Sequence, residues 1–403
     1  MPFLFSQQQN TNDDKINLMK RFILLIILLL GLTAFYFKGE LLNKFFPDKQ
    51  LINSEIQHIE SKTSDVFEKL NKTTKNDTQD NNEPINLDLT NLPGSKTLVN
   101  DYHIFQTFNN CGPASLSMAL SYYGINVDQK TLGQSLRPYQ NPRGDNDDKS
   151  VTLPELGKKA KEYGLVPLHR PNGTLMLIRR FIAAEIPVIT RTWLKENEDI
   201  GHYRVIKGYD INAETIVQDD SLQGKNIIFS MEEFDIIWKK FNYEYLVLVP
   251  MDKMELAKEI LGEDYDERTA WQNAVKLSES VLKEDPDDVY ARFNLAVAYY
   301  NLGEYQKTVN EYEKVATKLS FRTLWYQIEP ILAYYELGQY DKVFQITDSV
   351  LTNHNRAFSE LYLIRGDIYY KQGNMEKAKE EYEKAVYYNK SLEVAQEALN
   401  KVK

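Results

Sequence analysis

The sequence predicts an α+β domain followed by an all-α solenoid, with a single transmembrane helix near the N-terminus. Three observations predict this arrangement. Residues 22–37 contain no charged side chain, residues 96–250 combine helical and strand-like patterns, and residues 251–403 repeat a helical pattern at a fixed period. A chain of 403 residues with 42 % hydrophobic content can form two cores besides an apolar helix.

The apolar segment 22–37 is flanked by Lys20, Arg21 and Lys38. As a helix it spans about 24 Å at ~1.5 Å per residue, slightly less than the ~30 Å bilayer core, so the flanking lysines would extend to the interface. Residues 33–37 offer no small-residue cleavage site, which favours an uncleaved signal-anchor over a cleaved signal peptide or a buried core helix. Basic residues on the two sides are nearly balanced, so the orientation rests on the short leading tail. We expect residues 1–21 in the cytoplasm and everything beyond the span outside the cell membrane.

Residues 38–95 connect the anchor to the first domain. Leu51, Ile52, Ile56 and Ile59 have partial helical spacing and predict a juxtamembrane helix. Residues 71–83 contain no apolar side chain and cannot form a core, which predicts a flexible linker. Such a tether would keep the following domains near the membrane.

Cys111 is the only cysteine of the chain, which excludes an intrachain disulfide and a zinc site built on several thiolates. It stands where a loop turns into an apolar helix, because Pro113 suits a first helical turn and Gly124 a helix end. At a helix N-terminus, unpaired N–H groups and the positive end of the dipole favour thiolate over thiol. The same N–H groups can bind the oxyanion formed when a thiolate attacks a carbonyl, and Gln106 can add an amide donor.

His202 is the strongest candidate among five histidines, of which no pair has metal-ligand spacing. It lies near the start of the strand-like run 201–210, and a second run at 214–218 ends in Asp219 and Asp220. If the runs pair as a hairpin, His202 lies opposite the end of the second strand. An Asp there can hold one ring nitrogen and fix the tautomer that accepts the thiol proton.

These motifs resemble those of the bacterial double-glycine-leader cysteine peptidases, the thirty-ninth cysteine-peptidase family, which share a papain-like fold. The resemblance covers roughly residues 98–250 and consists of Gln-x4-Cys-Gly-Pro-Ala-Ser from Gln106, Gly-His-Tyr-x-Val-x-x-Gly-Tyr-Asp from residue 201, and a later Asp. It implies a papain-like cysteine peptidase domain at 96–250, with Cys111 as nucleophile, His202 as general base and then acid, and Gln106 in the oxyanion hole. The family's orienting Asp usually precedes a Pro, which is absent here, so Asp220 is the first choice and Asp219 the second.

Each of these residues also has a simpler interpretation. A lone Cys is most often a small buried hydrophobe, and adjacent Asp residues are a turn signal. The domain can also keep its fold without activity, as a scaffold for protein–protein interaction, or use the same Cys–His pair as an amidase or acyl transferase. The best-known members of the family that these motifs resemble carry an ATP-driven exporter on the same chain and cleave leader peptides during export. This sequence contains no Gly-x4-Gly-Lys-[Ser/Thr] phosphate loop, so leader cleavage coupled to export is not implied.

The rest of the first domain predicts helices at 153–164, 175–184 and 231–240, and strands at 186–191 and 245–249. The third helix opens on a capping box formed by Ser230 and Glu233. The loop at 141–148 is rich in carboxylates but lacks a full calcium-loop pattern, so we predict no metal and no other cofactor.

The C-terminal part repeats itself, since related segments begin at Ala298, Ala333 and Ile368, 35 residues apart. A period close to ~34 with a Gly turn predicts tetratricopeptide repeats over 251–403. Residues 270–286 fit the second half of an earlier repeat and 251–262 its first helix, while the segment 322–327 departs from the generic pattern. Stacked repeats leave a groove that commonly holds a peptide or protein, although a rigid spacer or dimerisation arm is the alternative.

The net charge of the chain indicates which classes of partner it can bind. A net charge of −10 without a basic stripe argues against nucleic acid. From the motifs, the repeats and the apolar segment together, we expect a peptide or protein substrate, a protein partner in the repeat groove, and attachment to the membrane through the N-terminal helix.

Overall fold

The protein is described by a computed structural model that covers residues 88–89, 91–139, 151–352 and 355–403, all within one compact unit. The tail 1–21, the expected anchor 22–37 and most of the connecting segment 38–95 lie outside these residues, as does the loop at 141–148. Across the described ranges, no helix combines the length and the apolar character that a bilayer crossing requires.

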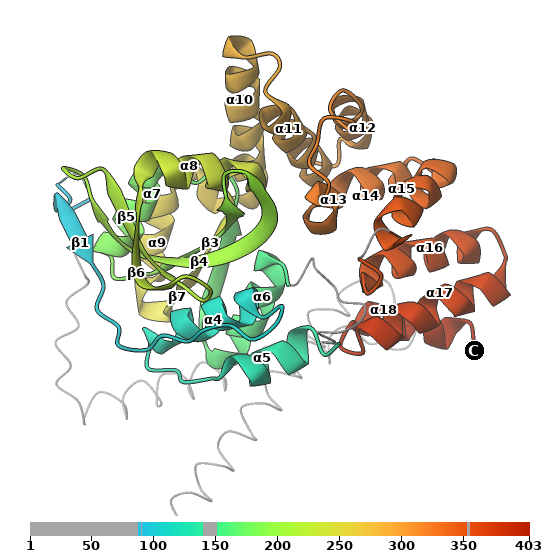
Figure 1. The fold of residues 1–403 in the computed structure, drawn as a ribbon, viewed down its shortest axis with the longest axis horizontal. Coiled ribbons are helices and arrows are strands. Elements are labelled where there is room, and N and C mark those ends of the chain that lie inside the picture. The colour runs from blue at the N-terminus through green and yellow to red at the C-terminus, as the bar shows by residue number, and fades with distance from the viewer. Residues whose placement is uncertain (1–87, 90, 140–150, 353–354) are drawn as a thin grey trace, which may run out of the picture. The chain divides into compact units, whose positions relative to one another are not determined.

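The described part of residues 95–249 contains a seven-stranded sheet, ordered β2-β7-β3-β4-β5-β6, with β1 beside β4 and every pairing antiparallel (Figure 1). The strands are β1 (Ser95–Thr97), β2 (Val166–Arg170), β3 (Val188–Lys195), β4 (Glu198–Asp210), β5 (Thr215–Asp220), β6 (Gly224–Ser230) and β7 (Tyr245–Val249). The predicted strands at 186–191 and 245–249 are confirmed as β3 and β7, and the predicted hairpin as β4–β5.

Among the described residues, six α-helices accompany the sheet: α4 (Cys111–Ser121), α5 (Gln129–Leu136), α6 (Leu153–Ala160), α7 (Leu175–Ala183), α8 (Met231–Trp238) and α9 (Met254–Leu261). The predicted helix at 153–164 ends earlier than expected, because a 3-10 turn at Lys161–Tyr163 follows α6 and Gly164 closes it at φ +82°. The capping box of Ser230 and Glu233 opens α8 as predicted.

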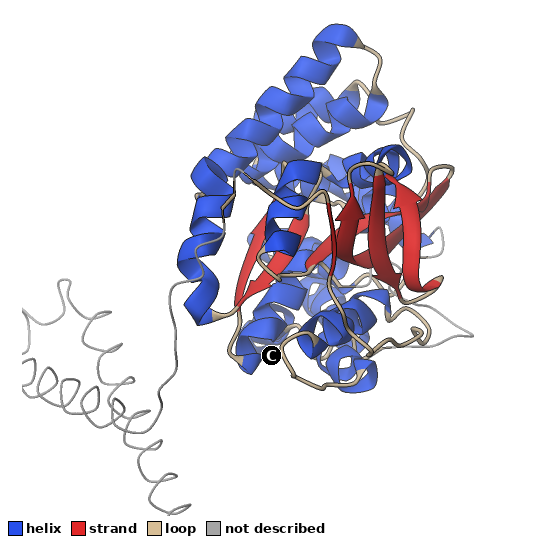
Figure 2. Cartoon of the chain, turned by 90° about the vertical axis from the view of Figure 1, so that its left-hand side faces the viewer, coloured by secondary structure: helices blue, strands red, loops and turns tan. Residues whose placement is uncertain are grey.

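Strand alternation distributes these helices over the two faces of the sheet. Ile189 and Val205 pack with α4, α5 and α6, whereas Val188 and Ile206, one residue away, pack with α7, α8 and α9. Side chains on a strand point alternately to opposite faces, so each face has its own helical layer and core. Figure 2 shows the strands in red among these helices. We call residues 95–261 the sheet domain.

Between residues 267 and 403 the described residues are mostly helical, and we call this part the repeat region. Its helices are α10 (Glu267–Glu284), α11 (Val289–Asn301), α12 (Tyr305–Glu313), α13 (Thr323–Tyr326), α14 (Glu329–Glu336), α15 (Tyr340–Thr352), α16 (Ser359–Lys371), α17 (Met375–Tyr388) and α18 (Glu393–Lys401). Gly303, Gly338 and Gly373 end α11, α14 and α16 at φ +81°, +70° and +77°, which confirms the predicted helix–Gly turn–helix period. The segment at 322–327 forms the short α13 together with the residue on each side of it. The helix assigned from sequence to the first repeat, α9, instead packs its Ile260 and Leu261 in the core of the sheet domain.

Candidate functional site

Cys111 is the first residue of α4 and is 6 % exposed. The helix starts there because Asn109 has φ +54°, a left-handed conformation that a helix cannot continue through. The side-chain amide of Asn110 donates to Thr107 Oγ1 at 2.7 Å and holds the preceding turn. No side chain of the described residues caps the first turn, and Pro113 has no N–H group, so the backbone N–H groups of Cys111 and Gly112 stand at the end of the helix where the thiol lies. Gly112 lets this end approach the rest of the domain, since an added Cβ would lie 2.3 Å from Val151 Cγ2.

His202 lies on β4 opposite Thr192 of β3 and is 2 % exposed. Its Nε2 is 2.9 Å from Asp220 Oδ1. The β4–β5 register explains this contact, because Arg204 is directly opposite Asp220 and His202 occupies the same face two residues earlier. The hairpin thus brings the predicted imidazole and carboxylate together.

The surroundings of the His202 ring raise its pKa. Burial alone would lower the pKa of His202, but the hydrogen bond to Asp220, the Cys111 thiol and the charges of both groups raise it above its usual value. A side-chain hydrogen bond with the Cys111 thiol is among the causes of this raised pKa, so the thiol lies next to the ring. Since Nε2 is engaged by Asp220, Nδ1 is the ring nitrogen that can accept the thiol proton.

Asp220 is a buried anion held by several donors. Its Oδ1 also accepts from the backbone N–H groups of Leu222 and Gln223 at 2.7 and 2.8 Å, and its Oδ2 accepts from Arg204 Nη1 at 2.5 Å. Burial opposes ionisation, but the hydrogen bond and charge of His202, the charge of Arg204 and the backbone donors prevail and lower the pKa of Asp220 to about 2. The carboxylate therefore stays charged throughout the neutral range.

Asp219 points to the other face of β5. Its carboxylate pairs with Lys207 Nζ at 2.7 Å and accepts from the backbone N–H of Asn226 at 3.0 Å and from Tyr122 Oη at 3.4 Å. Asp220, the first choice from sequence, is therefore the residue in contact with His202, and Asp219 belongs to a separate network.

Gln106 lies beside the turn that follows β5. Its backbone N–H donates to Ser221 O at 2.7 Å, and its Oε1 accepts from Ser221 Oγ at 2.8 Å. Because the oxygen end of the amide is engaged, the Nε2 end is the one left to donate. Both hydrogen bonds of Gln106 are therefore made with Ser221, the residue that follows Asp220 in the sequence.

Sequence reasoning missed two residues of this site, Arg204 and His103. Arg204 is fully buried, and its Nη2 donates to Leu194 O at 2.7 Å while Nη1 holds Asp220. His103 Nε2 is 3.0 Å from the backbone oxygen of Asp220. The signal for Arg204 was its position two residues after His202, which places both side chains on one face of a strand. No group of three or more potential metal ligands is assembled in the part of the chain that the structure describes.

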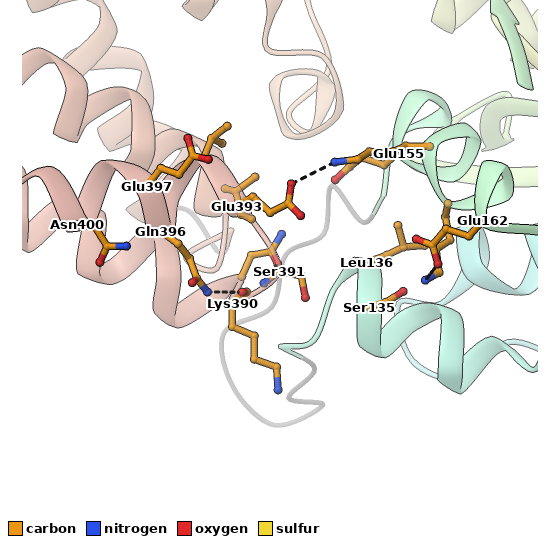
Figure 3. A pocket seen from close by; sticks show the side chains of 15 residues that line it. Ser135, Leu136, Glu155, Glu162, Lys390, Ser391, Glu393, Gln396, Glu397 and Asn400 are labelled. Carbon is orange, nitrogen blue, oxygen red and sulfur yellow. Dashed lines mark hydrogen bonds and ion pairs between the residues drawn. The ribbon is translucent and has the colours of Figure 1, made fainter. Parts of the chain in front are cut away.

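A separate cavity of about 740 Å³ lies away from these residues. Its lining comes from α5, α6, the turn after α6 and residues 389–400 of the repeat region, and neither Cys111 nor His202 takes part. Figure 3 shows acidic and basic side chains around it, and Glu393 pairs there with Lys158 Nζ at 3.5 Å.

Comparisons with known proteins follow the same division of the chain. Residues 97–246 match the Peptidase_C39 like family, and residues 261–320 and 359–402 match two tetratricopeptide repeat models. No curated protein matched the sequence.

Two similar solved structures correspond to the two parts. The peptidase domain of Streptococcus ComA, a bi-functional ABC transporter involved in a quorum sensing pathway, is 20 % identical over 37 % of this chain and 97 % of its own, with a TM-score of 0.29. A thermophilic tetratricopeptide repeat protein of Thermus thermophilus is 21 % identical over 33 % of this chain and 73 % of its own, with a TM-score of 0.27.

Proposed function

From a Peptidase_C39-like domain followed by tetratricopeptide repeats, we propose that the chain is a cysteine peptidase that cleaves peptide bonds and recruits a protein or peptide through its repeats. Cys111 is the nucleophile, His202 the general base and then the acid, Asp220 the residue that orients the imidazole, and Gln106 a donor to the oxyanion. No cofactor takes part in this reaction.

The observation that carries the proposal is the hydrogen bond of 2.9 Å between His202 Nε2 and Asp220 Oδ1, formed on a ring that also interacts with Cys111. A nucleophile beside a base that is itself oriented by a third group is the arrangement that activates a weak nucleophile. The ionised Asp220 stabilises the imidazolium that forms when the thiol loses its proton.

The chemistry proceeds in two stages. The Cys111 thiolate attacks the substrate carbonyl, forming a C–S bond, and the negative charge moves to the carbonyl oxygen. The N–H groups at the start of α4 and the Nε2 of Gln106 are the donors for that oxygen. His202 then gives its proton to the leaving amine as the C–N bond breaks, and a water activated by the same imidazole hydrolyses the thioester.

A second candidate function is a binding scaffold with an inactive peptidase fold. The observation that favours it is burial, since Cys111 and His202 are only 6 % and 2 % exposed. A substrate carbonyl must reach the sulfur atom for the first function but not for the second. An amidase or acyl transferase would use the same Cys–His pair on a different acyl group.

Selective alkylation of Cys111 separates these functions. The peptidase proposal predicts rapid labelling by a low concentration of iodoacetamide near neutral pH, and loss of that rapid labelling in His202→Ala. Labelling that is slow and independent of His202 favours the scaffold. Since Cys111 is the only thiol, the mass of the intact chain reports the reaction without digestion.

Digestion of a peptide library tests the reaction itself. We expect new cleavage products with the wild type and none with Cys111→Ala. Identical digests from the two proteins would contradict the peptidase function. Products that retain the intact peptide backbone but lose a side-chain amide would point to the amidase.

We also propose that residues 22–37 anchor the protein as a single-pass signal-anchor, with the sheet domain and repeats outside the cytoplasm. The absence of charge over this segment supports the anchor, and the apolar-free segment 71–83 supports a tether. Full-length chain should stay in the membrane pellet after carbonate extraction, and recovery in the supernatant would contradict the anchor.

A further inference from the structure

The repeat region contacts the strand that carries His202, and we infer that Tyr326 of α13 is a positioning residue for the candidate active site. This inference rests on the proposed function. It makes the repeats part of the site's geometry, in addition to any role in recruitment.

The contact is made at Gly201, the residue directly before His202. A Cβ added to Gly201 would lie 2.9 Å from Tyr326 Cε1 and 3.0 Å from Cδ1, so the ring lies flush against the backbone of β4. Tyr326 is only 6 % exposed and shares a small core with Trp193, Ile237 and Phe241 of the sheet domain. A close-packed contact of this kind transmits a displacement of the ring to the backbone.

The same ring helps to stabilise a buried cation on the neighbouring strand. Arg191 of β3 is 6 % exposed and forms no ion pair with any described residue. Its guanidinium carbon instead lies 4.9 Å from the ring centre of Phe241, 5.5 Å from that of Tyr326 and 5.8 Å from that of Tyr203. A buried charge needs such compensation, and the repeat region supplies one of the three rings.

Tyr203 extends this contact to the nucleophile. It follows His202 on β4, and its ring lies 3.5 Å from a Cβ built on Gly112, the neighbour of Cys111. Its Oη donates to Val151 O at 2.6 Å, which fixes the ring. Tyr326, Arg191 and Tyr203 therefore form a continuous packed path from the repeats to both sides of the Cys–His pair.

An ion pair fixes α13 at its start. Arg322 Nη1 is 2.8 Å from Asp199 Oδ1, and the backbone N–H of Arg322 donates to Asp199 Oδ2 at 2.9 Å. Asp199 lies three residues before His202 on β4. The two contacts, at Asp199 and at Gly201, hold α13 along the segment that leads into His202.

The test is the rate of Cys111 alkylation by iodoacetamide, measured over a range of pH on the full chain. Tyr326→Ala should slow the reaction by about tenfold to hundredfold, because small misplacements of reacting groups cost that much, and should move its pH profile. Tyr326→Phe keeps the ring against Gly201 and should stay within about twofold of wild type, since the ring atoms make the contact on which the inference rests. Tyr305→Ala, the same substitution in α12, is the matched control and should leave rate and profile unchanged, because the Tyr305 ring packs against Tyr300 and the core of the repeat region.

A double variant isolates the contact from general loss of stability. Gly201→Ala should slow alkylation in the wild type, where the added methyl group meets the ring, and should have no further effect in Tyr326→Ala, where the ring is gone. The inference is overturned if Tyr326→Ala alkylates like wild type, or if Gly201→Ala has the same effect in both backgrounds. Slow labelling of the wild type that does not depend on His202 would instead refute the proposed function, and this inference with it.

Discussion

Two adjacent carboxylates of β5 belong to different networks. Asp220 contacts His202 and Arg204, while Asp219 pairs with Lys207 on the opposite face of the sheet. Strand alternation alone makes this separation, since successive side chains point to opposite faces. Substitution of each residue in turn therefore distinguishes a contribution to the site from a contribution to the fold.

Asp220→Asn should lower the pKa of His202, because the hydrogen bond and charge of Asp220 are among the causes that raise it. Titration of the His202 ring by NMR measures the change. Asp219→Asn is the control. It leaves Lys207 without its buried partner and should cost stability of about 3 kcal/mol or more, yet it should leave the pKa of His202 in place. An equal change of this pKa in both variants would contradict the separation of the two networks.

Acid should destabilise the fold through Asp220. Its pKa in the folded protein is about 2, below the ordinary 3.8, so its contribution to stability is complete above pH 3.8 and is lost as the pH falls through about 2. The difference corresponds to about 2 kcal/mol in the free energy of unfolding. Denaturant titrations between about pH 5 and pH 2 should show this loss in the wild type. In Asp220→Asn the acid component should be missing, and its persistence would show that another carboxyl group is responsible.

At the scale of elements, the start of α4 depends on a close approach. Gly112→Ala would place a methyl carbon 2.3 Å from Val151 Cγ2, so the helix end or the segment around Val151 must move. Overpacking of this kind costs about 1–3 kcal/mol, measurable by urea unfolding. Gly94→Ala is the matched control, because its added Cβ would meet only atoms at 3.8 Å or more, and it should change stability by less than about 0.5 kcal/mol. Equal effects of the two substitutions would contradict the proposed clash.

The elements that could be predicted from sequence are those with uninterrupted patterns. The apolar run after Cys111 predicted α4, and the strand-like run around His202 predicted β4. Strands β2 and β6 were missed for local reasons. Pro167 interrupts the pattern of β2, and β6 begins with Gly224 and contains Asn226 at φ +56°, residues that indicate turns.

The site was predictable as a set of residue types and only partly as a set of contacts. Cys111, His202 and a following Asp could be named because each has a motif around it. The choice between Asp220 and Asp219 needed the β4–β5 register, which includes an irregularity between Ile206 and Gly208. The buried partner Arg204 and the approach of Tyr326 depend on pairing across distant segments, which spacing along the chain does not reveal.

At the scale of the whole molecule, the sheet domain and the repeat region share buried polar contacts. Asn294 of α11 donates from Nδ2 to Lys239 O at 2.6 Å, and its backbone oxygen accepts from Asn242 Nδ2 at 2.9 Å. Both Asn side chains are buried, so the loss of either hydrogen bond would leave polar groups with little access to solvent. These contacts couple the unfolding of the two parts.

We therefore expect one cooperative thermal transition for the wild type by scanning calorimetry. Asn294→Ala should weaken the coupling by about 1–3 kcal/mol and broaden or divide the transition, because it removes the side-chain donor to the partly buried carbonyl of Lys239. Asn301→Ala is the control. Its Nδ2 donates to Val297 O within the same helix, so its removal should shift the transition without dividing it. Two separate transitions in the wild type would contradict the coupling.

The single thiol of the chain also has a consequence for oxidative damage. A sulfenic acid formed at Cys111 has no resolving cysteine anywhere in the 403 residues, so it cannot be stored as an internal disulfide. Its return to the thiol requires an external reductant, and without one the next oxidation step is irreversible. In an oxidising compartment, the supply of small thiols would therefore set the working lifetime of the protein.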